Sequence, residues 1–172
     1  MRDSTRTADT LLLGLGNPIL GDDSVGCVLV DRIHELIGDA EGLHVVTASV
    51  SPVRLVDLIT GFNRLIVVDS VTTGRAEPGE LLEIDFTGRE FSPPSAHHFS
   101  IHQIPDIAAA LGLPCPGIIR VYGIEIIPAT EYCDTLSTEL EEKLPLLAEE
   151  IINRELKEFM SNDNTPRGEL VV

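Results

Sequence analysis

Three carboxylate side chains lie where apolar runs of the chain give way to polar residues. Asp22 and Asp23 follow the first apolar run, and Asp69 directly follows the run Leu65–Val68. Like-charged carboxylates that gather in one crevice repel each other unless a proton or a cation compensates them. If the fold brings these residues together, the chemistry that they suggest first is the binding of a divalent cation.

A nitrogen donor is available in the segment Ser95–Ile101, where His97 and His98 lie side by side just before a predicted helix. Two carboxylates and one imidazole suit a divalent transition metal and leave positions open for water or substrate. Each residue alone has a simpler interpretation. Aspartates favour the first turn of a helix, and a histidine in a surface loop is usually solvated.

The glycine-rich segment Gly14–Gly26 raises the alternative of a nucleotide-binding loop. A dinucleotide fingerprint needs a glycine where Ile19 stands, and two aspartates at the start of the next helix would repel a pyrophosphate. We therefore interpret the loop as a frame for Asp23. The residues that would shape it are Gly14, Gly16, Asn17, Asp22 and Gly26.

Other hydrolase motifs do not fit the sequence. His34 and Glu35 are not followed by the second histidine of a thermolysin-type zinc site, and Ser24 lacks the spacing of a nucleophile elbow. Cys27 could form a nucleophilic pair with a distant histidine, but its place on an apolar helix face favours a buried thiol. The three cysteines show no paired spacing, so we expect reduced thiols of which at least two are buried.

Composition and charge exclude several classes of partner. The chain has 172 residues, enough for one domain, and its 43% apolar residues with 4% aromatics are typical of soluble α/β proteins. Twelve basic against 28 acidic residues leave a formal charge of −16, which would repel nucleic acid and anionic membranes. No signal peptide or transmembrane helix is predicted, so we expect a cytoplasmic protein.

Hydrophobic periodicity predicts the elements that must position these residues. Strands are expected at 11–13, 43–46, 65–68 and 118–124, with an added strand at 81–86 that could pair antiparallel. Helices are expected at 25–36, 52–58, 101–111 and 134–160, the last one kinked or split by Pro145. We expect one domain over residues 11–160, a flexible N-terminus at 1–10 and a disordered tail at 161–172.

Strands that alternate with helices predict a mostly parallel sheet covered by helices on both faces. In such sheets, ligands bind beyond the carboxyl ends of the strands. The loop after the first strand carries Asp22 and Asp23, and the third strand is predicted to end at Asp69. This arrangement would place both carboxylate groups in the same crevice.

Three blocks of sequence follow one another in a fixed order between residues 11 and 127. They are LLLGLGNPILGDDSVG, then LIVVDSV, then SAHHFSI followed by RVYGIEI. Together they resemble the proteases that remove a C-terminal extension from the nickel-loaded large subunit of [NiFe] hydrogenases. The resemblance implies an aspartyl endopeptidase-like hydrolase whose fold is a phosphorylase/hydrolase-like, three-layer α/β/α domain with a mostly parallel, twisted sheet.

The resemblance also implies which residues form the site. Asp23, Asp69 and His97 would bind nickel and act in catalysis, with His98 as the alternative ligand to His97. In this family the nickel is understood to belong to the substrate, so the expected partner is the large-subunit precursor, which supplies the metal. Other divalent metals could occupy the site in vitro.

Two departures and two alternatives accompany the resemblance. Many relatives carry Glu where this chain has Asp23, and they often carry glycines where it has Thr47–Pro52. The same residues could serve a metal-sensing chaperone module that binds an immature subunit without cutting it. GLGNP also opens peptidyl-tRNA hydrolases, but the acidic charge and the missing histidine after this motif disfavour that function.

Overall fold

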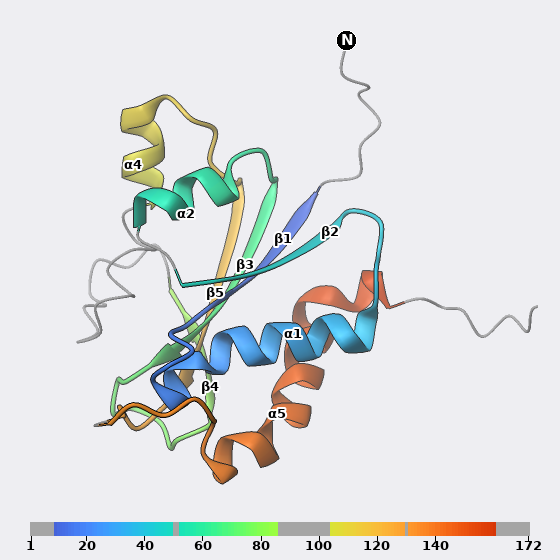
Figure 1. Ribbon diagram of the computed structural model, residues 1–172. Coiled ribbons are helices and arrows are strands. Elements are labelled where there is room, and N and C mark those ends of the chain that lie inside the picture. The colour runs from blue at the N-terminus through green and yellow to red at the C-terminus, as the bar shows by residue number, and fades with distance from the viewer. Residues whose placement is uncertain (1–8, 50–51, 86–103, 130, 161–172) are drawn as a thin grey trace, which may run out of the picture.

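The computed structural model describes residues 9–49, 52–85, 104–129 and 131–160 (Figure 1). In these residues five strands form one sheet of order β2-β1-β3-β5-β4. They are β1 (Thr10–Leu15), β2 (Leu43–Ala48), β3 (Arg64–Val71), β4 (Leu81–Ile84) and β5 (Ile118–Glu125). All neighbours are parallel except β4, which pairs antiparallel with β5. The mixed, mostly parallel sheet predicted from the sequence is therefore confirmed.

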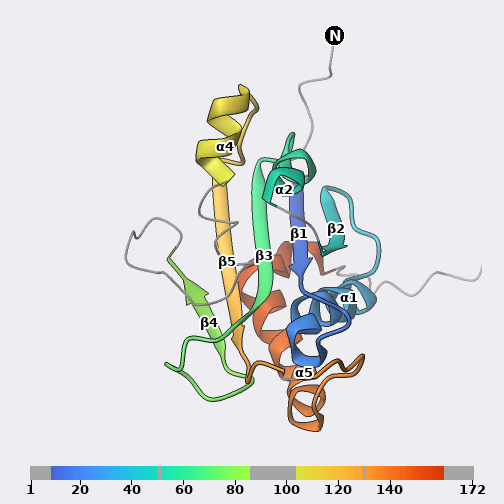
Figure 2. The same cartoon turned by 60° about the vertical axis from the view of Figure 1, so that its left-hand side comes forward.

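Helices cover both faces of this sheet. On one face lie α1 (Val25–Ile37) and α5 (Thr138–Ile151), and on the other lie α2 (Pro52–Ile59) and α4 (Ile104–Leu111) (Figures 1 and 2). Successive residues of β1 alternate between the two cores: Leu12 packs on the α1 side, whereas Leu11 and Leu13 pack on the α2 side. A strand that is buried on both faces reads as a continuous apolar run, which explains the Leu11–Leu13 segment.

Two glycines allow α1 to pack closely against the carboxyl ends of β1 and β3. A Cβ atom on Gly26 would lie 2.3 Å from the carbonyl oxygen of Leu15 and 2.5 Å from that of Val68. A Cβ atom on Gly14 would lie 2.6 Å from the carbonyl oxygen of Gly26. The glycines that could suggest a phosphate loop instead bring the start of the helix onto the sheet.

The C-terminal helical region differs from its prediction at both ends. α5 begins at Thr138, not at Asp134, because Ser137 caps it: the Ser137 hydroxyl accepts a hydrogen bond from the backbone N–H of Leu140 at 3.5 Å. The helix runs through Pro145 unsplit, since its buried face holds it against the core. After Ile151 the regular helix gives way to a π-helical turn and then a 3-10 turn, which together cover residues 152–159.

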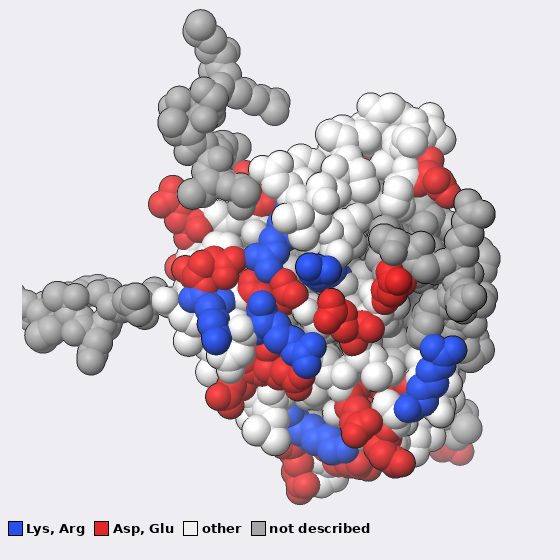
Figure 3. Space-filling model, turned by 180° about the vertical axis from the view of Figure 1, so that it is seen from behind, with Lys and Arg blue, Asp and Glu red and all other residues white. Residues whose placement is uncertain are grey.

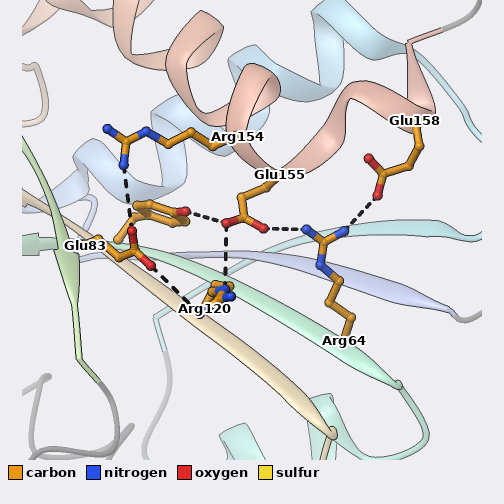
Figure 4. Close-up of polar contacts among 7 residues, drawn as sticks. Arg64, Glu83, Arg120, Arg154, Glu155 and Glu158 are labelled. Carbon is orange, nitrogen blue, oxygen red and sulfur yellow. Dashed lines mark hydrogen bonds and ion pairs between the residues drawn. The ribbon is translucent and has the colours of Figure 1, made fainter.

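The turns after α5 are tied to the sheet by a network of charged side chains (Figure 4). The buried Glu155 carboxylate bonds the guanidinium of Arg64 on β3 and accepts a hydrogen bond from the Tyr122 hydroxyl of β5 at 2.5 Å. Arg64 also reaches the more exposed Glu158 at 2.8 Å. On the face seen in Figure 3, Lys and Arg side chains lie among Asp and Glu side chains.

No described helix is long and apolar enough to cross a membrane.

Candidate active site at the carboxyl ends of β1 and β3

Asp69 is a buried carboxyl group near the carboxyl end of β3. Its strand continues to Val71, two residues further than predicted, and the side chain is only 1% exposed. The pKa of Asp69 is raised from 3.8 to about 7: burial raises it most, the backbone N–H of Ser70 lowers it in part, and the nearby charge of Asp23 raises it again. That N–H donates a hydrogen bond to Asp69 Oδ1 at 2.8 Å. The carboxyl therefore holds a proton up to about neutral pH.

Asp23 lies in a 3-10 turn, Gly21–Ser24, between β1 and α1. Its Oδ1 accepts a hydrogen bond from the hydroxyl of Ser70 at 2.6 Å. Ser70 thus contacts both aspartates, one through its backbone N–H and the other through its side chain. The two carboxyl groups that the predicted topology brings to one edge of the sheet are therefore linked through Ser70, and the charge of Asp23 acts on Asp69.

The loop before Asp23 is folded against its own backbone. The backbone N–H of Asn17 donates to the carbonyl oxygen of Asp23 at 3.2 Å, and Asn17 Oδ1 accepts from the N–H of Ile19 at 3.2 Å. A Cβ atom on Gly16 would lie 2.4 Å from the Asp23 carbonyl oxygen. These contacts fix the path of the chain from β1 into the 3-10 turn, and with it the position of the Asp23 side chain.

Asp22 has a different role from its neighbour. Its Oδ1 accepts a hydrogen bond from the backbone N–H of Ser137 at 2.6 Å, so it holds the segment that leads into α5. The backbone N–H of Gly21 donates to the carbonyl oxygen of Cys133 at 2.6 Å in the same segment. Asp22 therefore connects two loops, whereas Asp23 is linked to Asp69 through Ser70.

His97 and His98 lie outside the described residues. Within the described ranges, no group of three or more histidine, cysteine, aspartate or glutamate side chains is placed to hold a metal ion. What these ranges supply is two carboxyl groups, which are oxygen donors suited to a divalent cation. Such a cation would also offset the repulsion between the two aspartates when both are ionised.

The family model described as hydrogenase maturation protease (HycI) matches residues 27–154, most of the chain. The chain belongs to the hydrogenase maturation protease family. This membership confirms the resemblance seen in the sequence and makes the protein a hydrolase that cuts peptide bonds. The matched range of this protease includes Asp69 but begins four residues after Asp23.

Solved structures of similar fold carry related names. The hydrogenase maturating endopeptidase HybD from E. coli has a TM-score of 0.69 and 18% identity, over 84% of this chain and 90% of that one. The [NiFe] hydrogenase maturation protease HycI from Thermococcus kodakarensis KOD1 has a TM-score of 0.68 and 22% identity, over 89% and 95%. At such identities the likeness shows a shared α/β fold. None of the curated proteins matches the chain significantly.

Glu125 is a buried carboxylate that sequence reasoning missed. It ends β5, is 3% exposed, and accepts hydrogen bonds from Thr73 N–H at 2.7 Å, Thr73 Oγ1 at 2.5 Å and Gly74 N–H at 2.8 Å. It therefore anchors the loop that follows Asp69 and Ser70. The available signal was a single carboxylate between Ile124 and Ile126 at the carboxyl end of an apolar strand.

Cys27 does not have the properties of a nucleophile in this protease. Burial raises the pKa of its thiol to about 11, so the reactive thiolate is scarce at neutral pH. Its Sγ donates to the carbonyl oxygen of Gly14 at 3.5 Å. All three cysteines are free, as predicted, but the expected burial of two was wrong: Cys27 and Cys115 are half-buried and Cys133 is exposed. The Cys27 thiol lies against the carbonyl oxygens of Gly14 on β1 and Ala48 on β2, and these contacts cover it only in part.

Proposed function

We propose that this protease is an endopeptidase that removes the C-terminal extension of the large subunit of a [NiFe] hydrogenase after nickel has been loaded into that subunit. Membership of the hydrogenase maturation protease family supports the reaction class. The observation that carries the proposal is the pair Asp23 and Asp69, joined through Ser70 at the carboxyl ends of β1 and β3.

In this proposal the two aspartates contact the nickel of the substrate. A buried carboxyl with a pKa of about 7 beside a second carboxylate favours the arrival of a positive charge, which would displace the proton from Asp69. His97 would supply the nitrogen donor, with His98 as the alternative. Because the metal comes with the substrate, the free protease would hold no permanent nickel, although other divalent ions could occupy the site in vitro.

Nickel supplied in this way makes cleavage conditional on a filled hydrogenase site. The substrate's nickel can polarise the scissile carbonyl or activate the attacking water. In the overall reaction the water oxygen bonds to the carbonyl carbon, the peptide C–N bond breaks, and the new amine takes a proton. The protein's contribution is to hold the metal and the scissile bond in one fixed geometry.

The direct test is incubation of the purified protease with nickel-loaded large-subunit precursor, followed by mass spectrometry of the precursor. We expect the precursor to lose a C-terminal peptide. If precursors of several hydrogenases remain at full mass, the proposed activity is wrong. Stable binding of an uncut precursor would instead support a module that senses the metal and only holds the subunit.

A further inference from the structure

Residues 131–137, the docked segment, are held on the loop that carries Asp23. The backbone N–H of Cys133 donates to the carbonyl oxygen of Ile19 at 3.2 Å, and the N–H of Gly21 donates to the carbonyl oxygen of Cys133 at 2.6 Å. Leu20 and Cys133 form a parallel bridge, and Asp22 adds the side-chain contact to Ser137 at 2.6 Å. These bonds fix the docked segment relative to the candidate site.

Two large apolar side chains are exposed where the loop and the docked segment meet. Tyr132 is 83% exposed and directly precedes Cys133, and Ile19 is 54% exposed and directly precedes Leu20. Because Leu20 and Cys133 form a parallel bridge, the residues that precede them, Ile19 and Tyr132, lie on neighbouring segments beside the turn that carries Asp23. The core of the fold makes no use of either side chain.

Exposed apolar side chains that lie side by side next to a candidate catalytic site are suited to bind a protein partner. Tyrosine is among the residues that contribute most to binding at such surfaces, because it buries a large ring at little entropic cost. The hydrogen bonds of the docked segment hold the surface before any partner arrives, which lowers the entropic cost of association. The features of a docking surface are therefore present next to Asp23.

We propose that Tyr132 and Ile19 form the surface on which the nickel-loaded large-subunit precursor docks, a proposal that rests on the function proposed above. The part of the precursor that it meets carries apolar side chains with basic groups beside them. We expect basic groups on the precursor because the acidic side chains of Glu131 and Asp134 are exposed on either side of Tyr132 and Cys133, and the chain has a net charge of −16. Docking here seats the nickel and the scissile bond of the precursor against Asp23.

The test compares the cleavage kinetics of Tyr132→Ala, Ile19→Ala and the double variant with those of the wild type. We expect KM for nickel-loaded precursor to rise about tenfold for Tyr132→Ala and more for the double variant, while kcat stays within about twofold. Tyr132→Phe keeps the ring and should resemble the wild type. Leu111→Ala is the matched control, because Leu111 is 55% exposed on α4 at the far end of the molecule (Figure 1).

Affinity is measured in parallel by calorimetric titration of the same precursor into Asp69→Ala protein with and without the Tyr132→Ala change. A tenfold weaker affinity that depends on Tyr132 supports the surface even if no protein cleaves the precursor, a result that would count against the proposed function alone. Unchanged KM and unchanged affinity in the double variant would overturn the docking proposal. So would a fall in kcat at unchanged KM, which would place these residues in the chemistry.

Discussion

Two buried carboxyl groups of this protease, Asp69 and Glu155, lie in opposite electrostatic surroundings. Glu155 is neutralised by the chain itself: it bonds the guanidinium of Arg64, lies 4.0 Å from Arg120 and accepts the Tyr122 hydroxyl. Asp69 lies near Asp23, whose charge has the same sign. Glu155 therefore stabilises the fold by joining the turns after α5 to the sheet. Asp69, in contrast, is suited to bind a cation that a ligand or substrate supplies.

The surroundings of Glu155 and of Asp69 also differ in what a raised pKa does there. Burial, and then the hydrogen bond to Glu155, raise the pKa of Tyr122, so its hydroxyl stays protonated and continues to donate. At Asp69, burial and Asp23 raise the pKa to about 7, which leaves the carboxyl able to exchange its proton for a cation in the physiological range. A buried carboxylate alone thus does not indicate a site, whereas a second carboxylate beside it favours the binding of a cation.

The largest expected effect is on cleavage when either aspartate is removed. Asp23→Ala and Asp69→Ala should each lower kcat/KM for nickel-loaded precursor by about 1,000-fold or more, because in the proposed site each would remove an oxygen donor to the metal. Asp57→Ala, at an exposed position on α2, is the matched control. Mass spectrometry of the precursor measures the loss, and circular dichroism checks the fold. Cleavage at the control rate by either variant would contradict the assignment.

The next largest effect is a loss of stability when Glu155 is removed. Glu155→Ala leaves Arg64 and Tyr122 beside an empty position, so the free energy of unfolding should fall by about 3–5 kcal/mol. Glu158→Ala removes the exposed partner of the same Arg64 and should cost less than about 1 kcal/mol. Urea unfolding measures both. If the two variants lose the same free energy of unfolding, the burial of Glu155 does not make it more important for stability than the exposed Glu158.

A third expected effect is a gain in stability at alkaline pH for Asp69→Asn. The folded-state pKa of about 7 lies above the ordinary value of 3.8. From about pH 4 to pH 7 the unfolded chain has released this proton while the folded chain keeps it, so the wild type loses stability with rising pH across this window. The variant lacks this loss, which is on the order of 4 kcal/mol at 1.4 kcal/mol for each of about three pKa units.

Urea unfolding of the wild type and Asp69→Asn at pH 4 and pH 8 measures this difference. The advantage of the variant should be larger at pH 8 and small at pH 4. Asp57→Asn, at an exposed position, serves as the control and should show little change between the two pH values. An advantage of equal size at both pH values would mean that Asp69 does not titrate between them.

The smallest expected effect is at Ser70, which joins the two aspartates. Ser70→Ala removes the hydroxyl that donates to Asp23 Oδ1 but keeps the backbone N–H that donates to Asp69. A hydrogen bond to a charged group contributes about 1.5 kcal/mol or more, so kcat/KM should fall about tenfold. Ser70→Thr keeps a hydroxyl and should recover most of the activity. If both variants lose the same activity, packing at this position matters and the hydrogen bond does not.

Much of the fold could be predicted because its signals are local. Leu11–Leu13 and Leu65–Val68 are continuous apolar runs, which only strands buried on both faces require. The juxtaposition of Asp23 and Asp69 also followed from the sequence, because parallel strands bring their carboxyl ends to one edge of the sheet. The helix start at Thr138 was missed because acidic and apolar residues keep a helical period from Asp134 onward.

The remaining features depend on partners that are distant in the sequence. Ser70 and Asp23 are 47 residues apart, Glu125 and Thr73 are 52 apart, and Arg64 and Glu155 are 91 apart. A single sequence does not indicate which of many serines, glutamates and arginines will meet. Such pairs depend on strand register and helix docking, which follow from the packing of the whole domain.

The central claim is that the carboxyl pair meets the nickel of the substrate. It is tested most directly by cleavage of one precursor prepared with and without nickel, each incubated with metal-free protease and followed by mass spectrometry. The account predicts that only the nickel-loaded precursor loses its C-terminal peptide. Equal cleavage of the nickel-free precursor would contradict it.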